Sequence, residues 1–103
     1  MDAFTAIAEP NRRRMLELLA MGEQAAGEIA RVVPDLTQPA VSRHLRVLRE
    51  SGLVHVRASG QRRIYGLEPA GLQAIATWLE RYRTLWTGAL DRLDRQLREE
   101  PTR

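Results

Sequence analysis

The chain has 103 residues, all 16 of its basic side chains are arginine, and it contains no cysteine. This length is typical of one domain, so we predict a single domain over residues 1–103. The lack of cysteine excludes disulfides, thiolate metal sites and thiol redox sensing. No stretch approaches the roughly 18 apolar residues of a membrane span, and the start lacks a signal-peptide pattern, so we expect no membrane partner and a cytoplasmic location.

The net charge of +3 is concentrated in the middle of the chain. Residues 31–63 carry seven arginines against two acidic residues, whereas residues 1–30 have two more acids than bases and residues 64–103 are balanced. A basic segment in a nearly neutral protein is typical of a nucleic-acid binder. The exclusive use of arginine has a simpler explanation as well, because a GC-rich genome favours arginine codons.

The first three helices are expected at residues 2–8, 10–21 and about 26–33. Phe4 and Ile7 share one side of the first helix. Pro10 suits the first turn of the second helix, where its missing N–H costs nothing. Gly22 is expected to end that helix, and Pro34-Asp35 to form the turn after the third.

The fourth helix is the most informative segment. Thr37 predicts its N-cap, and Gly52 its end. Val41, Leu45 and Leu48 recur at the spacing of one helical face and predict its core side. A short helix, a tight turn and an amphipathic helix form the helix-turn-helix pattern.

A hairpin and a long helix complete the chain. Residues 54–57 alternate apolar with polar side chains, Ser59-Gly60 is expected to form the turn, and Tyr65 and Leu67 place one face of the return strand on the core. The last helix should run from Pro69 to about Arg98, with a frayed tail at residues 99–103. The fold class is therefore mainly α with a small β-hairpin: a winged helix-turn-helix with five helices, a wing and a long C-terminal dimerisation helix.

Apolar residues recur along the last helix in steps of mostly three and four, as in a coiled-coil seam. A helix of this length cannot lie wholly against so small a core, so we predict a homodimer built on the first helix and residues 69–98. The alternative is a helix packed only within its own subunit. The predicted interface residues are Phe4, Ile7, Leu72, Ile75, Leu79, Tyr82, Trp86, Leu90 and Leu93. Trp78 and Trp86, with Tyr82 between them, could instead line a small-molecule pocket.

DNA-contacting residues are predicted on the fourth helix and the hairpin. Helix-turn-helix proteins present the N-terminal and exposed parts of the second helix to base edges, and a basic wing grips the backbone. The predicted DNA-binding residues are Thr37, Gln38, Pro39, Ala40, Ser42, Arg43, His44, Arg46, Arg57, Gln61, Arg62 and Arg63. For His44, a packed role and a phosphate contact are equally compatible with its place at the edge of the apolar face. Arg12, Arg13 and Arg14 are interpreted as surface and salt-bridge residues, and His55 as structural or solvated.

Three segments, EPNRRRMLELL, TQPAVSRHLRVLRESGLV and GQRRIYGL, occur in an order and spacing that resembles the ArsR/SmtB-type winged-helix repressors. The resemblance covers nearly the whole chain, and the middle segment is its most specific part. It implies a homodimer that binds a palindromic operator, often in its own promoter, and releases it when an inducer binds.

The chain departs from the metal-sensing members of that family. Such sensors commonly carry cysteines in the third helix, where residues 23–27 offer none, or His and acidic ligands on the last helix, which has no His. Carboxylates alone bind transition metals weakly. We therefore predict no metal site and no cofactor, and place the chain in the non-metal branch.

Other functions stay open at this point. A winged helix can serve as a protein–protein contact module, and such a module would show no salt-dependent affinity for DNA. A repressor could also be released by a small molecule, or by a metal held through carboxylates and a His. No constellation of catalytic residues is present, so we predict that the chain is not an enzyme.

Overall fold

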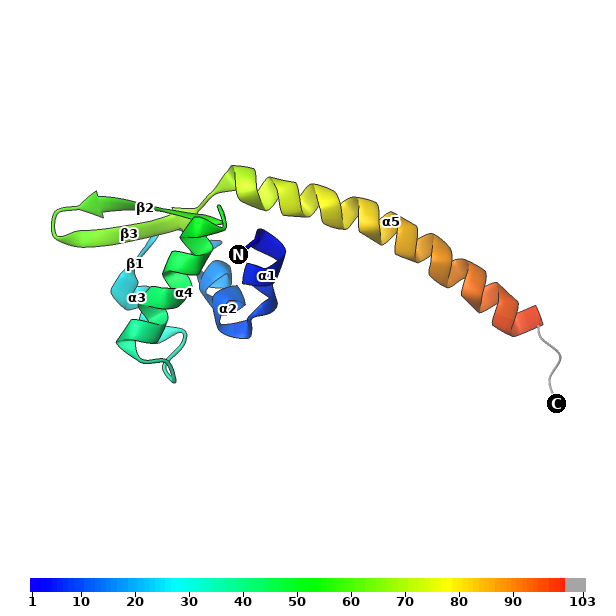
Figure 1. The fold of residues 1–103 in the computed structure, drawn as a ribbon, viewed down its shortest axis with the longest axis horizontal. Coiled ribbons are helices and arrows are strands. Elements are labelled where there is room, and N and C mark those ends of the chain that lie inside the picture. Colours follow the sequence, from blue (N-terminus) through cyan, green and yellow to red (C-terminus); the bar gives the residue numbers. More distant parts are fainter. Residues whose placement is uncertain (100–103) are drawn as a thin grey trace. The chain divides into compact units, whose positions relative to one another are not determined.

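Five helices and three strands follow one another along residues 1–99, the part of the chain that the computed structural model describes (Figure 1). They are α1 (Ala3–Ala8), α2 (Pro10–Leu19), β1 (Gln24–Ala25), α3 (Ala26–Arg31), α4 (Gln38–Glu50), β2 (Val54–Ser59), β3 (Arg62–Leu67) and α5 (Pro69–Glu99). The predicted fold class is confirmed, although α2 and α3 each end two residues earlier than expected. Glu99 is still helical; the rest of the tail predicted to be frayed lies outside the described residues.

Side-chain caps explain where three of the helices begin. Asp2 accepts a hydrogen bond from the Thr5 amide at 2.8 Å and caps α1. Glu9 ends α1 and caps α2 by accepting from the Arg12 amide at 2.9 Å, with Pro10 in the first turn. Thr37 caps α4, as predicted, with its hydroxyl oxygen 3.3 Å from the Ala40 amide. Each cap satisfies an amide that the first turn of a helix leaves without a partner.

Gly52 ends α4 in a left-handed conformation, with φ of +77°. The amides of Gly52 and Leu53 bond to the carbonyls of Arg49 and Leu48 at 3.0 Å each, which is the Schellman arrangement. Gly71, in the first turns of α5, approaches this corner so closely that a Cβ there would overlap the Gly52 carbonyl oxygen. The chain therefore needs glycine at both positions.

The three strands form one antiparallel sheet in the order β1-β3-β2. Ser59 pairs with Arg62, so the hairpin loop is Gly60-Gln61 and lies one residue later than predicted. Gly60 has φ of +63° and Gln61 does not have positive φ, as in the type II′ turn that suits a two-residue loop. Strand β1 was not predicted, because two residues are too short to show any periodicity.

The core of residues 1–73 lies where α1–α4 meet the sheet. Met15, Ile29 and Leu48 are fully buried, and the predicted core face of α4 is buried throughout. Its other buried apolar side chains are Ala6, Leu19, Val33, Val41, Leu45, Leu53, Val54 and Tyr65. This unit therefore holds a continuous apolar interior of its own.

Residues 74–99 of α5 form the second unit, and they bury little. Ile75 is the single buried side chain along the described length of α5. The Trp78 and Tyr82 rings stack at 4.5 Å, and the Tyr82 and Trp86 rings meet edge to face at 5.6 Å. No helix within residues 1–99 combines the length and the apolar character that crossing a membrane requires.

Candidate nucleic-acid interface

The polar face of α4 is open to solvent. Its apolar side chains point into the core, so Gln38, Ser42, Arg43 and Arg46 are left exposed on the other sides of the helix. Thr37 and Pro39 are exposed at its start and Ala40 is half-buried. The N-terminal turns of α4 can therefore approach a ligand without disturbing the core.

The two faces of the hairpin carry different basic residues. Side chains alternate along a strand, so Arg63 lies on the same face as the buried Tyr65, which is the face toward α4. Arg62 and its neighbour across the ladder, Ser59, lie on the opposite face, and Gln61 is at the tip. The wing therefore presents positive charge on both faces near its end.

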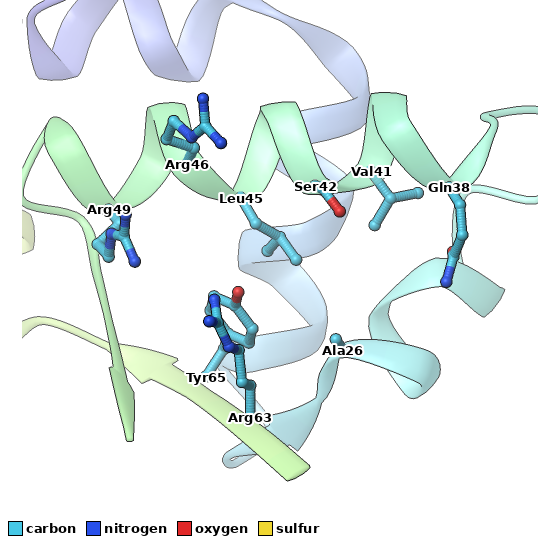
Figure 2. A pocket seen from close by; sticks show the side chains of 9 residues that line it. All are labelled: Ala26, Gln38, Val41, Ser42, Leu45, Arg46, Arg49, Arg63 and Tyr65. Atoms are coloured by element: carbon cyan, nitrogen blue, oxygen red, sulfur yellow. The ribbon is translucent and has the colours of Figure 1, made fainter. Parts of the chain in front are cut away.

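A groove of about 330 Å³ separates α4 from β3. Figure 2 shows Val41 and Leu45 pointing from α4 toward the sheet, and Arg63 and Tyr65 rising from β3 toward the helix. Arg49 lies at one end of the groove and Gln38 at the other, with Arg46 at the rim. The groove has apolar walls and a basic mouth.

Arg57, one of the predicted DNA contacts, forms an ion pair within the chain. Its guanidinium donates to both carboxylate oxygens of Glu23, from Nε at 3.1 Å and from Nη2 at 3.3 Å. This hydrogen-bonded pair lowers the pKa of Glu23 and raises the pKa of Arg57. The pair links β2 to the residue just before β1. The sequence of β2 alone does not indicate this contact.

His44 lies on the other side of α4, beside a buried arginine. Arg12 is only 8% exposed, and its guanidinium donates to the Ala6 carbonyl at 2.6 Å and to His44 Nδ1 at 3.1 Å. Since arginine only donates, Nδ1 accepts and the neutral ring carries its proton on Nε2. The arrangement favours the packed role for His44 over a phosphate contact.

The interpretation of Arg12 as a surface residue is therefore wrong, because this arginine joins the last turn of α1 to α4. Arg13 is exposed but also bound, donating at 2.8 Å to the carbonyls of Ile7 and Ala8 at the end of α1. A cation is favourable there because the carbonyls at a helix end carry partial negative charge.

The arginines of the candidate site differ from Arg12, Arg13 and Arg57, because their side chains have no bonding partner in the described part of the chain. Five arginine side chains form no hydrogen bond or ion pair with any residue in the 1–99 range that the structure describes: those of Arg43, Arg46, Arg49, Arg62 and Arg63. All five are exposed. Positive charge that no acid within residues 1–99 neutralises is therefore present on α4 and at the end of the wing.

Arg49 and Tyr65 are the polar groove residues that were not among the predicted DNA contacts. Arg49 follows Ser42 by seven positions and Arg46 by three, which places it on the same side of α4. Tyr65 follows Arg63 by two positions on a strand, so the two share a face. Helical and strand periodicity would have indicated both residues, had the groove between the elements been foreseen.

The predicted interface residues differ in exposure. Phe4 and the α5 residues Leu79, Tyr82, Trp86, Leu90 and Leu93 are all at least 40% exposed. Ile7 and Leu72 are half-buried. Ile75 is only 7% exposed in the single chain, so it has little surface left to offer a partner.

No group of three or more His, Asp or Glu side chains is arranged to hold a metal ion within residues 1–99. His55 is half-buried over the backbone of Gly66, where a Cβ would lie 2.7 Å from its Cε1 atom. The site consists of exposed arginine, amide and hydroxyl groups, which can donate hydrogen bonds to an anionic ligand.

Comparison with known proteins identifies this arrangement. Residues 7–57 match the family model of a helix-turn-helix domain. The chain is 48% identical over 88 residues to the HTH-type transcriptional regulator Rv2034 of Mycobacterium tuberculosis, covering 85% of this chain and 78% of the relative. It is 33% identical over 78 residues to the transcriptional repressor SdpR of Bacillus subtilis, covering 76% of this chain and 86% of the relative.

A solved structure shows the same fold. The crystal structure of an ArsR family transcriptional regulator superposes with a TM-score of 0.71 at 30% identity, covering 82% of this chain and 91% of the other. All three relatives are named as regulators of transcription, which confirms the expectation that the chain is not an enzyme. Their agreement with the helix-turn-helix and its wing shows that the chain belongs to the ArsR family of DNA-binding transcriptional regulators.

Proposed function

We propose that the protein is a homodimeric repressor that occupies a palindromic operator, including one in its own promoter. The observation that carries the proposal is the set of exposed arginines on α4 and the wing without partners in residues 1–99. In this account α4 enters a major groove, where Arg43 and Gln38 face base edges. Arg62 and Arg63 bind the flanking backbone and position the helix.

The second copy is proposed from the apolar side of α5. Leu79, Trp86, Leu90 and Leu93 are 47%, 48%, 57% and 50% exposed, and they recur at steps of seven, four and three. Exposed apolar side chains at coiled-coil spacing favour a matching helix. We propose that α1 and residues 69–98 form the interface, and that the whole chain acts as one winged-helix subunit.

A two-fold dimer places two copies of α4 on one face of the duplex. The two half-sites should then lie about one helical turn apart, roughly 10 base pairs between centres, and mirror the symmetry of the protein. We propose that no thiolate metal is sensed, because the chain has no cysteine. Any inducer would act by shifting the dimer between geometries that fit and do not fit the operator.

Fluorescence anisotropy across a salt series tests the proposal. The labelled duplex is the DNA upstream of the protein's own gene, and the control is the same sequence scrambled. We expect tighter binding of the upstream duplex, with affinity that falls steeply as salt rises because counterions are released. The absence of binding to either duplex at low salt would overturn the proposal and favour a protein–protein contact module.

A further inference from the structure

The groove between α4 and β3 concentrates positive charge in a confined space. Arg49 from α4 and Arg63 from β3 line it, Arg46 stands at its rim, and no acidic residue is among the lining side chains (Figure 2). None of the three arginines is paired within residues 1–99. Cations held near one another without a counterion repel, and an anion between them relieves that repulsion.

Tyr65 supplies an independent observation from the wall of the groove. Its side chain is only 7% exposed, and its hydroxyl has no hydrogen-bond partner in the part of the chain that the structure describes. No fully buried side-chain oxygen or nitrogen in that part lacks a partner, so the small accessible area of Tyr65 must include the hydroxyl oxygen. Figure 2 shows this oxygen directed toward α4, across the groove.

Packing in the core does not require the hydroxyl group of Tyr65, which is accessible and has no hydrogen-bond partner within residues 1–99. Phenylalanine would fill the same apolar space, whereas a tyrosine hydroxyl usually finds a partner when the ring is buried. The hydroxyl is set between Val41 and Leu45 on one side and Arg63 on the other. An acceptor bound here would receive the phenol hydrogen and guanidinium hydrogens together, in surroundings that strengthen both interactions.

We propose that this groove is a phosphate-binding site in which Arg49, Arg63 and the Tyr65 hydroxyl hold one phosphate group. A phosphate offers several acceptor oxygens in different directions, which suits donors arriving from a helix and from a strand. The inference rests on the proposed function, because a DNA backbone that passes between α4 in the major groove and the wing would bring a phosphodiester to this position. A free phosphate ester has the same chemistry and is distinguished by experiment.

The Tyr65→Phe variant tests the hydroxyl without changing charge or shape. We expect affinity for upstream and scrambled duplexes to fall alike by roughly tenfold, as for a hydrogen bond to a charged group, with the salt dependence unchanged. Arg49→Gln should weaken binding and also reduce the salt slope by about one, because it removes a cation. Thr84→Val, which deletes a hydroxyl on α5 outside the groove, is the matched control and should bind as the wild type does.

Neutral methylphosphonate linkages, placed one at a time in the duplex, locate the phosphate. At one position per half-site the substitution should weaken the wild type, and at that position it should cost Tyr65→Phe much less, because the two changes remove the same interaction. In a parallel arm, inorganic phosphate replaces chloride at constant ionic strength. Stronger competition against the wild type than against Tyr65→Phe, without methylphosphonate coupling, would assign the site to free phosphate instead.

The proposal is overturned if Tyr65→Phe binds DNA as the wild type does and neither arm shows a difference between the two proteins. Failure of the proposed function gives a different result, because the wild type would then bind no duplex at low salt. Thermal unfolding of each variant checks that it folds. Because Arg49 is exposed, the Arg49→Gln variant should keep a melting temperature near the wild-type value. The binding test with Arg49→Gln therefore stays valid even if Tyr65→Phe proves unstable.

Discussion

Helices α4 and α5 are both amphipathic, but they differ in what becomes of their apolar sides. Val41, Leu45 and Leu48 of α4 are at most 4% exposed, since the helix packs them within its own unit. Along α5 from residue 74 onward, Ile75 alone is buried, and side chains such as Leu90 and Leu97 are 57% and 62% exposed. One helix has completed its apolar contacts and the other has not.

This difference indicates that α4 and α5 bind different kinds of partner. Because α4 needs nothing more on its apolar side, its exposed arginines are available to an anionic ligand such as DNA. Full burial of a large apolar side chain that α5 exposes would contribute at most about 1.5–3 kcal/mol, so α5 favours an apolar partner. A second copy of the same helix provides one.

The substitution Leu90→Asp should have the most severe effect, because it places a charge on the apolar side of α5. A charge on the apolar side of α5 would have to be buried without a partner, so the dimer dissociation constant should rise at least about a hundredfold. Thr84→Asp adds the same charge on the opposite side of the helix and should leave dimerisation intact. Sedimentation velocity across a concentration series measures both. Equal behaviour of the two variants would mean that the exposed side of α5 is not an interface.

Gly71→Ala should destabilise the compact unit by about 3 kcal/mol, as overpacking does. The new Cβ would overlap the Gly52 carbonyl oxygen and lie 2.8 Å from its carbon. In contrast, Gly88→Ala meets only the flexible end of Arg92 at 3.5 Å, and alanine in a helix interior should stabilise it by about 0.5–1 kcal/mol. Thermal and urea unfolding should show changes of opposite sign in the free energy of unfolding of the two variants. A neutral Gly71→Ala would contradict the close approach of the two chain segments.

Arg43→Ala should reduce discrimination between the upstream and scrambled duplexes by about 2 kcal/mol, because a bidentate base contact is lost. Arg62→Ala lies on the wing and should weaken both duplexes alike, with a salt slope lower by about one. Anisotropy titrations of both variants against both duplexes separate these patterns. An Arg43→Ala protein that keeps its full preference would remove Arg43 from base reading.

The smallest expected effect concerns acid stability and compares Glu9 with Glu80. Partial burial opposes ionisation of Glu9, but the hydrogen bond from the Arg12 amide and the positive charge of the Arg12 guanidinium outweigh it and lower the pKa of Glu9. A lowered folded-state pKa adds stability that is present above the unfolded pKa and is lost as pH falls through the folded one. Glu9→Gln should therefore cost under about 1 kcal/mol at pH 7 and nothing at pH 2–3.

Glu80 provides the control for that titration. Its pKa is also lowered, by the hydrogen bond from Arg83, but the pair is fully exposed on α5. Glu80→Gln should leave the melting temperature unchanged between pH 3 and pH 7, because solvent screens such pairs. A pH dependence as large for Glu80→Gln as for Glu9→Gln would show that the Glu9 environment adds nothing specific.

Local patterns explain which parts of the fold could be predicted. The N-cap at Thr37, the buried face of α4 and the start of α5 at Pro69 each depend on residues within a few positions of one another. The sequence could not indicate strand β1, because its two residues are defined only by pairing with Ile64 and Tyr65 some 40 positions later.

Long-range contacts also explain which pairings of the candidate site residues the sequence could not indicate. Arg57 and Glu23 are 34 positions apart, and Arg12 and His44 are 32 apart, so neither pairing leaves a periodic signal. Arg43 and Arg46 could be placed without any long-range contact, because a helical wheel puts them opposite the core. Tyr65 was recognised as a core residue, but its open hydroxyl depends on the groove that α4 and β3 form together.

Selection of binding sequences from a random duplex library tests whether two copies of α4 bind one operator together, because the library offers the protein every possible operator at once. A dimer that places two α4 helices on DNA should enrich an inverted repeat with half-site centres about 10 base pairs apart. Leu90→Asp protein in the same selection should fail to enrich the full repeat. Enrichment of a single asymmetric motif by the wild type, or of no motif at all, would show that the protein does not bind DNA as a two-fold dimer.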